Sequence, residues 1–216
     1  MSVLVCIPTA HDIHALTAAA AFRICAGHAD GAEFQTFLAQ PTDYARNLCV
    51  RHFLGGRHTH MLFLDSDILP PDNVLEVMLG VDQPIVCGIY PLLLDGARVC
   101  TCLARRTGEH EYAFLDDFPE TPFEVDAAGL GCTLIARDVF SRVKAPWFLF
   151  EHRPDGQLTG EDFHFFESAA RVGYRPLVIP QIQCSHFKTV DLMDVIRAVH
   201  RAQQTPDRVA AEAPPV

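Results

Sequence analysis

The sequence predicts an α/β fold: a Rossmann-like mixed, mainly parallel sheet flanked by helices, with a small antiparallel ribbon. Three observations predict it. Short β-rich apolar runs alternate with segments of helical periodicity over residues 1–90, as in βαβ units. An Asp95-Gly96 pair then signals a hairpin. Finally, 216 residues with 49% apolar side chains can fill the core of one large domain, which we expect over residues 1–204.

The first part of the chain alternates between strand-like and helix-like segments. Each strand-like run is short and apolar, and a proline, a glycine or a polar turn ends it. Each helix-like segment carries an apolar stripe at helical spacing. In chain order we expect a strand at 3–7, a helix over 13–24 ended by Gly27, a strand at 34–38, a helix that begins at 41–43, a strand at 61–64, a helix over 74–79 capped by 71–73, and a strand at 85–89.

From residue 92 onward the pattern changes. Residues 99–103 and 111–115 are predicted to pair as an antiparallel ribbon, and the acidic, proline-bearing stretch 116–122 to form a surface loop. The remaining elements are a strand after Gly131, a helix over 161–172, strands at 177–179 and 182–186, and an amphipathic helix bearing Leu192, Val195, Ile196 and Val199. We expect the Ala- and Pro-rich tail 205–216 to be disordered.

Composition argues against several functional classes. A formal charge of −10 argues against nucleic-acid binding, because a phosphate backbone selects for clustered lysine and arginine. No apolar stretch reaches membrane-spanning length, and the apolar start is too short and uncharged to be a signal peptide. Eight scattered cysteines without a Cys-x-x-Cys pair fit reduced core thiols. We therefore expect a cytoplasmic protein that needs a metal or a few placed cations to handle an anionic ligand.

The apolar run 61–64 ends in Asp65-Ser66-Asp67. On an extended backbone side chains alternate between faces, so Asp65 and Asp67 are expected to project to one side and Ser66 to the other. Two carboxylates at the carboxyl end of a sheet strand suit a hard divalent cation that carries substrate phosphates. The alternative is that both aspartates solvate a strand end and start a turn, which an isolated Asp-x-Asp favours.

A second acidic pair, Glu161-Asp162, follows Thr159-Gly160 at the start of a predicted helix. Neighbouring side chains on a helix diverge by about 100°, so we expect one carboxylate to face the cleft and the other to support it. The alternative is a capping box between Thr159 and Asp162, with about 0.3 to 1 kcal/mol gained from the helix dipole. A capping acid can also serve as a catalytic base.

Three further side chains could each have a functional role or a purely structural one. His186, at the end of a late apolar segment, could join carboxylates and phosphate oxygens around a borderline metal such as Mn²⁺, or be an ordinary hydrogen-bonded histidine. Lys188 could neutralise a phosphate, or be a solvated lysine. Arg46, early in its helix, could fork onto a phosphate or stack on a base, or be an exposed helix arginine.

Gly129 and Gly131 would allow the backbone to approach a ligand closely, or would form an ordinary turn. They lack the Gly-x-Gly-x-x-Gly spacing of a dinucleotide site. Two histidine pairs lack the His-Glu-x-x-His form of a zinc protease and are set aside: His11 with His14, and His58 with His60.

In this order the segments resemble the metal-dependent glycosyltransferases of the GT-A fold, above all the small, soluble, family 2-type enzymes with an Asp-x-Asp motif. The resemblance covers residues 1–190 and rests on segments 6–9, 45–47, 62–68, 88–91, 128–135, 160–166 and 184–186. The chain lacks the Gln-x-x-Arg-Trp motif and the membrane helices of the polymerising branch, which argues for a non-processive enzyme. Cys132 stands where the family usually has an aromatic residue.

The resemblance implies a hexosyl-type transferase that uses Mn²⁺ or Mg²⁺ and a nucleoside-diphosphate sugar, with UDP as the expected nucleotide. It places the base and ribose near Thr9 and Arg46, with Asp65 near the ribose. It further implies a donor-binding set and a metal-binding set. The donor-binding set is Thr9, Arg46, Asp65, Ser66, Asp67, Gly131 and Lys188, and the metal-binding set is Asp65, Asp67 and His186.

The catalytic pair implied by the resemblance is Asp162 with Glu161. Asp162 would deprotonate the acceptor hydroxyl, which gives an inverting single displacement. A retaining route stays open, as do the acceptor (a glycan, a lipid or a protein) and the oligomeric state.

Two other functional classes share part of this pattern. A nucleotidyltransferase would have the same sheet and paired aspartates, but usually a basic, Gly-rich phosphate loop where this chain has Pro8-Thr9-Ala10-His11. A noncatalytic nucleotide-sugar or carbohydrate-binding module would keep the metal carboxylates and need no base.

Overall fold

The computed structural model describes residues 1–28, 31–94, 98–108, 111–152, 156 and 158–204. Within these residues a seven-stranded sheet forms the centre of the fold. Its strands lie in the spatial order β10 (Phe123–Glu124), β15 (Leu177–Gln183), β5 (Ile85–Ile89), β12 (Cys132–Ala136), β3 (His60–Leu64), β1 (Val3–Thr9) and β2 (Ala32–Leu38).

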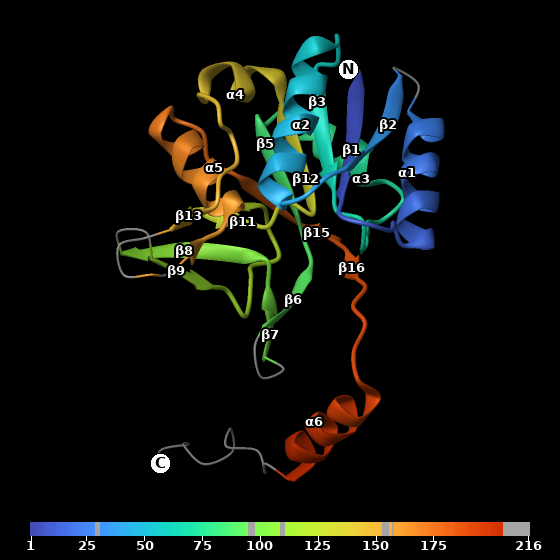
Figure 1. The fold of residues 1–216 in the computed structure, drawn as a ribbon, viewed down its shortest axis with the longest axis vertical. Helices are drawn as coiled ribbons and strands as arrows, with labels where there is room; N and C mark the ends of the chain where they lie inside the picture. Colours follow the sequence, from blue (N-terminus) through green and yellow to red (C-terminus); the bar gives the residue numbers. More distant parts are fainter. Residues whose placement is uncertain (29–30, 95–97, 109–110, 153–155, 157, 205–216) are drawn as a thin grey trace, which may run out of the picture.

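The direction of the strands confirms the predicted mixed, mainly parallel sheet. β1 pairs in parallel with β2 and β3, and β5 pairs in parallel with β15. β12 lies antiparallel between β3 and β5, and β10 is antiparallel to β15. The strands are linked or followed by α1 (Ala15–Gly27), α2 (Thr42–Gly55), α3 (Val74–Gly80), α4 (Arg137–Arg142) and α5 (Glu161–Arg171), and α2 lies across the front of the sheet in Figure 1.

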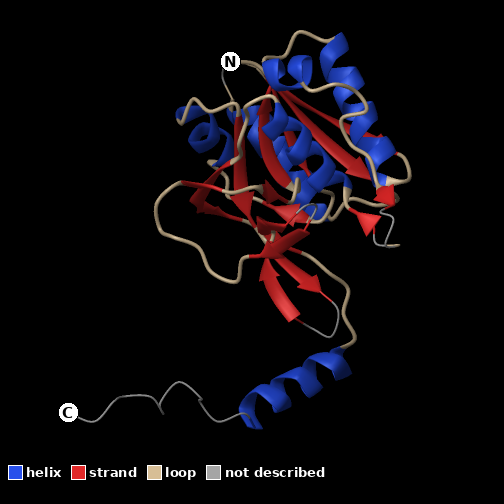
Figure 2. Ribbon diagram, turned by 90° about the vertical axis from the view of Figure 1, so that its left-hand side faces the viewer, coloured by secondary structure: helices blue, strands red, loops and turns tan. Residues whose placement is uncertain are grey.

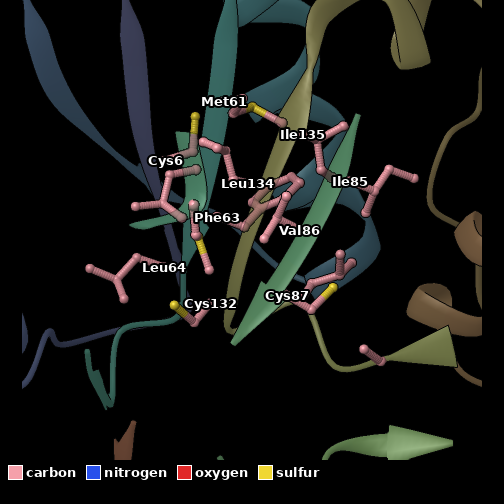
Figure 3. Close-up of a cluster of buried hydrophobic side chains, with 14 of the residues drawn as sticks. Cys6, Met61, Phe63, Leu64, Ile85, Val86, Cys87, Cys132, Leu134 and Ile135 are labelled. Atoms are coloured by element: carbon pink, nitrogen blue, oxygen red, sulfur yellow. The ribbon is translucent and has the colours of Figure 1, made fainter. Parts of the chain in front are cut away.

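The core lies in the middle of this sheet. Every residue of β1 and of β5 is buried, as expected for strands covered on both faces. Figure 3 shows side chains of β3 and β12, among them Phe63 and Leu134, gathered with those of β1 and β5. Seven of the eight cysteines are buried and Cys25 is partly buried, which agrees with the expected position of these side chains in the core.

The antiparallel part differs from the predicted pairing. The ribbon expected between 99–103 and 111–115 is wrong in its partners: β7 (Arg98–Thr101) pairs with β6 (Pro91–Leu94), and β9 (Glu111–Phe114) pairs with β8 (Leu103–Gly108). The apolar run 91–94 is nearer along the chain, so it pairs with β7 at a smaller cost in loop-closure entropy. The hairpin turn predicted at Asp95-Gly96 lies outside the described residues. β11 (Ala127–Ala128) completes a three-stranded sheet with β8.

The predicted strands at 177–179 and 182–186 are one strand, β15, followed by the short β16 (Ser185–His186). The register of β15 against β5 shifts between Val178 and Gln183. Pro180 lies within this stretch and has no N–H to donate to the ladder, which is why the sequence pattern breaks there although the strand continues. β16 pairs antiparallel with β4 (Ile68–Leu69), and β13 (Glu151–His152) pairs with β14 (Leu158–Thr159).

The last helix, α6 (Leu192–Gln204), forms where predicted but does not pack on the sheet. Figures 1 and 2 show it apart from the body of the fold, at the end of an extended segment. The apolar side chains of its stripe are exposed: Leu192, Val195, Ile196 and Val199. No described helix combines the length and apolarity needed to cross a membrane. The tail predicted to be disordered lies outside the described residues.

Candidate functional site

Asp65, Ser66 and Asp67 form a turn at the end of β3. The backbone N–H of Ile68 donates to the carbonyl oxygen of Asp65 at 3.1 Å, so the segment is a closed turn and not an extension of the strand. The extended backbone expected here is therefore wrong, and so is the expectation that Ser66 faces away from the two aspartates, because all three residues line one cavity. The two aspartates lie on the wall of one cavity because the turn places them there. Aspartate is common in turns because its side chain can hydrogen-bond to nearby backbone groups.

That cavity has a volume of about 390 Å³. Its walls come from the end of β1, from residues that directly follow β1, β2 and β3, from the first turns of α2, and from Lys188 after β16. The carboxyl ends of neighbouring parallel strands are where open α/β sheets bind ligands. The lining residues are Pro8, Thr9, Ala10, Ala39, Thr42, Ala45, Arg46, Asp65, Ser66, Asp67 and Lys188. All members of the predicted donor-binding set except Gly131 line it.

Arg46 links the cavity to the second acidic pair. Its side chain is buried, so the alternative of an exposed helix arginine is wrong. Nε donates to Oε1 of Glu161 at 3.0 Å, and Nη2 donates to both carboxylate oxygens of Asp65, at 3.0 and 3.2 Å. Burial alone would lower the pKa of Arg46, but the negative charges of Asp65 and Glu161 raise it overall. Arg46 is thus a fixed cation between two carboxylates.

Asp67 interacts with two groups from the segment after β15. Its Oδ2 lies 2.6 Å from Nζ of Lys188 and 3.3 Å from Nε2 of His186. Nδ1 of His186 lies 2.7 Å from the carbonyl oxygen of Pro91, so Nδ1 carries a hydrogen and Nε2 faces the carboxylate. Burial would raise the pKa of Asp67, but a hydrogen bond from His186, when its ring carries both protons, and one from Lys188 lower it to about 2. Asp67 is therefore ionised at neutral pH.

The donor atoms around Asp67 fit a divalent cation in part. Nε2 of His186 and Oδ2 of Asp67 converge, and the Nδ1 hydrogen bond of His186 is the usual way in which a protein orients a metal-binding imidazole. Within the described part of the chain, no three side chains of His, Cys, Asp or Glu gather as a metal site. Asp65 is engaged by Arg46 instead. The set of Asp65, Asp67 and His186 therefore stays a prediction, with Asp67 and His186 the pair that the geometry brings together.

The start of α5 separates the roles of the second acidic pair. The N-cap is Gly160 and makes no side-chain capping bond, so the capping box between Thr159 and Asp162 does not form. Glu161 supports Arg46, whereas Oδ1 of Asp162 accepts the N–H of Phe163 at 2.8 Å. Burial and the neighbouring charge of Glu161 raise the pKa of Asp162 to about 7. Asp162 does not line the cavity, but it lies one residue beyond the carboxylate that holds Arg46.

Gly129 and Gly131 make room for Tyr90 and Asp65. The N–H of Gly131 donates to Oη of the buried Tyr90 at 3.1 Å, and its carbonyl oxygen accepts the N–H of Asp65 at 3.0 Å. A Cβ on Gly131 would lie 3.0 Å from Oδ2 of Asp65. The glycines therefore permit close approach of protein groups behind the cavity, and Gly131 supports Asp65 without lining the cavity itself.

Gly129→Ala is expected to destabilise the protein, because a Cβ at this position would lie 2.0 Å from Oη of Tyr90. Overpacking of this kind costs about 1 to 3 kcal/mol, measurable as a lower urea midpoint. Gly55→Ala at the end of α2, where nothing lies within 4 Å of the added carbon, is the control and should not destabilise. Equal midpoints for the two variants would contradict the close packing of Tyr90.

Three residues near the site were given no role from the sequence: His14, Phe187 and Tyr90. The N–H of His14 donates to the carbonyl oxygen of Ser66 at 2.8 Å, and its ring stacks on Phe187 at 3.9 Å between centroids. His14 was set aside with the other paired histidines, and no local pattern connects it to Phe187. Tyr90 directly follows β5, and its place at a strand end was the signal that could have identified it.

Comparisons with known proteins identify the fold. No protein family and no curated protein matches the sequence. Among solved structures, A197 from STIV is similar with a TM-score of 0.62 and 21% identity, over 88% of this chain and 87% of that one. GalNAc-T7 with UDP, GalNAc and Mn²⁺ is similar with a TM-score of 0.59 and 11% identity, over 99% of this chain and 46% of that one. At these identities the likeness shows a GT-A-like fold.

Proposed function

We propose that this chain is a metal-dependent, non-processive glycosyltransferase that moves a sugar from a nucleoside-diphosphate sugar, with UDP as the nucleotide, to an acceptor hydroxyl. One observation carries the proposal: a cavity at the carboxyl ends of β1, β2 and β3 unites two carboxylates, Asp65 and Asp67, with two cations, Arg46 and Lys188. The fold around it is similar to that of GalNAc-T7, which was solved with UDP, GalNAc and Mn²⁺.

The cavity supplies what a diphosphate leaving group needs. Asp67 and His186 would hold a divalent cation, which when bound stabilises the negative charge that develops on the phosphates. One or two protein ligands suffice where phosphate oxygens and water complete the coordination. Lys188 adds a positive charge on the same wall. The protein therefore has the cationic groups to stabilise the leaving diphosphate without transferring a proton to it.

The rigid part of the site would hold the nucleotide. Nη2 of Arg46 fixes both oxygens of Asp65, and each oxygen keeps a lone pair that can accept a ribose hydroxyl. Thr9 is anchored by a hydrogen bond from its hydroxyl to the carbonyl oxygen of Asp12 at 2.9 Å. The loop after β1 and the turn after β3 are thus fixed by side-chain hydrogen bonds before any ligand arrives, which reduces the entropy cost of binding.

Asp162 would be the general base. A base is most effective when its pKa lies near the working pH, and the pKa of Asp162 is about 7. The bond from Arg46 to Glu161 fixes the first turn of α5 against the cavity wall, which positions Asp162. Removal of the acceptor proton by this carboxylate would give an inverting displacement.

A thermal-shift panel tests the proposal. UDP, GDP, CDP and ADP are each added with and without Mn²⁺, and UDP with Mn²⁺ is expected to give the largest rise in Tm. Ligand at 100 times its Kd stabilises the native state by about 2.7 kcal/mol. Asp67→Asn should remove the metal dependence of the shift. Equal shifts without metal would contradict the role of Asp67, and binding without turnover of any donor would indicate a binding module.

A further inference from the structure

The ammonium group of Lys188 contacts the same carboxylate oxygen of Asp67 that would coordinate a metal. Its Nζ is 2.6 Å from Oδ2 of Asp67, and the same oxygen faces Nε2 of His186 at 3.3 Å. Lys188 also lines the cavity that contains Asp65 and Arg46. The ammonium group therefore neutralises the carboxylate in the absence of a bound ion.

The backbone of this segment is fixed next to the turn that carries Asp67. The N–H of Phe187 donates to the carbonyl oxygen of Asp67 at 2.9 Å, and His186 pairs with Ile68 across β16 and β4. The Lys188 side chain, in contrast, is 47% exposed. An exposed ion pair of this type is weak, because water competes for both charges. The ammonium group is thus positioned close to Asp67 by a fixed backbone, but it is held there weakly.

A lysine at position 188 suits a cation that must dissociate from Asp67 when a metal binds. The chain has 17 lysines and arginines, and only Lys144 and Lys188 are lysines. An arginine can hold carboxylates through several nitrogens at once, as Arg46 does with Nη2 on Asp65 and Nε on Glu161. A lysine presents one compact, strongly hydrated charge on a flexible four-carbon stem, which exchanges partners more easily.

We propose that Lys188 is an internal counter-cation, which neutralises Asp67 until a divalent cation displaces it and which then binds the diphosphate of the donor. The exchange leaves no charge unpaired: the metal replaces the ammonium on Asp67, and the phosphates supply a new anion for the ammonium. The first step concerns only this chain and the metal. The second step rests on the proposed function.

The first step is tested by calorimetric titration of Mn²⁺ alone. Lys188→Gln should bind Mn²⁺ about twofold to fivefold more tightly than the unchanged protein, the range set by an exposed ion pair. Lys188→Arg should bind it more weakly, and the matched control Lys144→Gln, at an exposed lysine, should be unchanged. Equal or weaker Mn²⁺ binding by Lys188→Gln overturns the proposal, as does the absence of Mn²⁺ binding in both proteins.

The second step is tested by titrating UDP in saturating Mn²⁺. Lys188→Gln should bind UDP several-fold more weakly, the opposite sign to its effect on Mn²⁺, and unchanged UDP affinity would overturn this step. Far-UV circular dichroism of Lys188→Gln and Lys188→Arg checks that both variants fold. If the unchanged protein binds no UDP, the proposed function fails, whereas the titration with Mn²⁺ alone still decides whether Lys188 competes for Asp67.

Discussion

Asp162→Asn is expected to lower the rate of sugar transfer by about 10² to 10⁴-fold while UDP binding is retained, because the change removes a general base and leaves the cavity walls intact. The pKa of Asp162 is raised to about 7, so only its deprotonated fraction can accept the acceptor proton. The rate of the unchanged protein should therefore fall about tenfold for each pH unit below 7. Turnover against pH, with UDP affinity measured in parallel, checks both statements.

The same substitution should stabilise the fold, with a defined pH dependence. The pKa of Asp162 is raised from the ordinary aspartate value of 3.8 to about 7, so folding disfavours the ionised form. The cost is full above pH 7, shrinks as the pH falls towards 4, and is absent below that. Asp162→Asn should thus raise Tm most at pH 8, whereas Asp72→Asn, at an exposed aspartate, should not. A variant with lower Tm at pH 8 would show that Asp162 is a structural residue.

Most of the central sheet could be predicted from the sequence because its information is local. The strands β1, β3 and β5 are buried on both faces, so each reads as a continuous apolar run. The pairing of the short strands after residue 90 could not be predicted, because an alternating pattern identifies a strand without identifying its partner. Pro180 interrupts the apolar pattern of the sequence, although strand β15 continues through it.

Like the fold, the candidate site has features that the sequence predicts and features that depend on tertiary contacts. Asp65 and Asp67 are neighbours in the sequence, so their pairing could be predicted even though the argument from strand alternation was wrong. The bond between Arg46 and Glu161 joins residues separated by 115 positions, and no spacing in the chain indicates it. The competition between Lys188 and a metal for Asp67 also depends on a tertiary contact. Sequence patterns thus identified the candidate groups, and only the fold shows which charges neutralise one another.

Arg46→Met is expected to lower the free energy of unfolding by about 3 to 5 kcal/mol, because it leaves Asp65 and Glu161 without their shared cation in a buried position. Urea unfolding measures the loss. Arg23→Met is the matched control, since Arg23 pairs with Asp72 at the same 3.0 Å but with side chains that are 49% and 78% exposed. An exposed pair contributes about 0.2 to 1 kcal/mol.

A second variant separates charge burial from packing. Arg46→Met combined with Glu161→Gln removes one of the two uncompensated carboxylates, so it should recover part of the lost stability, and the non-additivity measures the coupling of the pair. UDP binding should be impaired both in Arg46→Met and in the double variant, because in both Asp65 lacks the hydrogen bonds that hold it. If Arg46→Met cost no more than Arg23→Met, the buried arginine would not be the cation that organises this site.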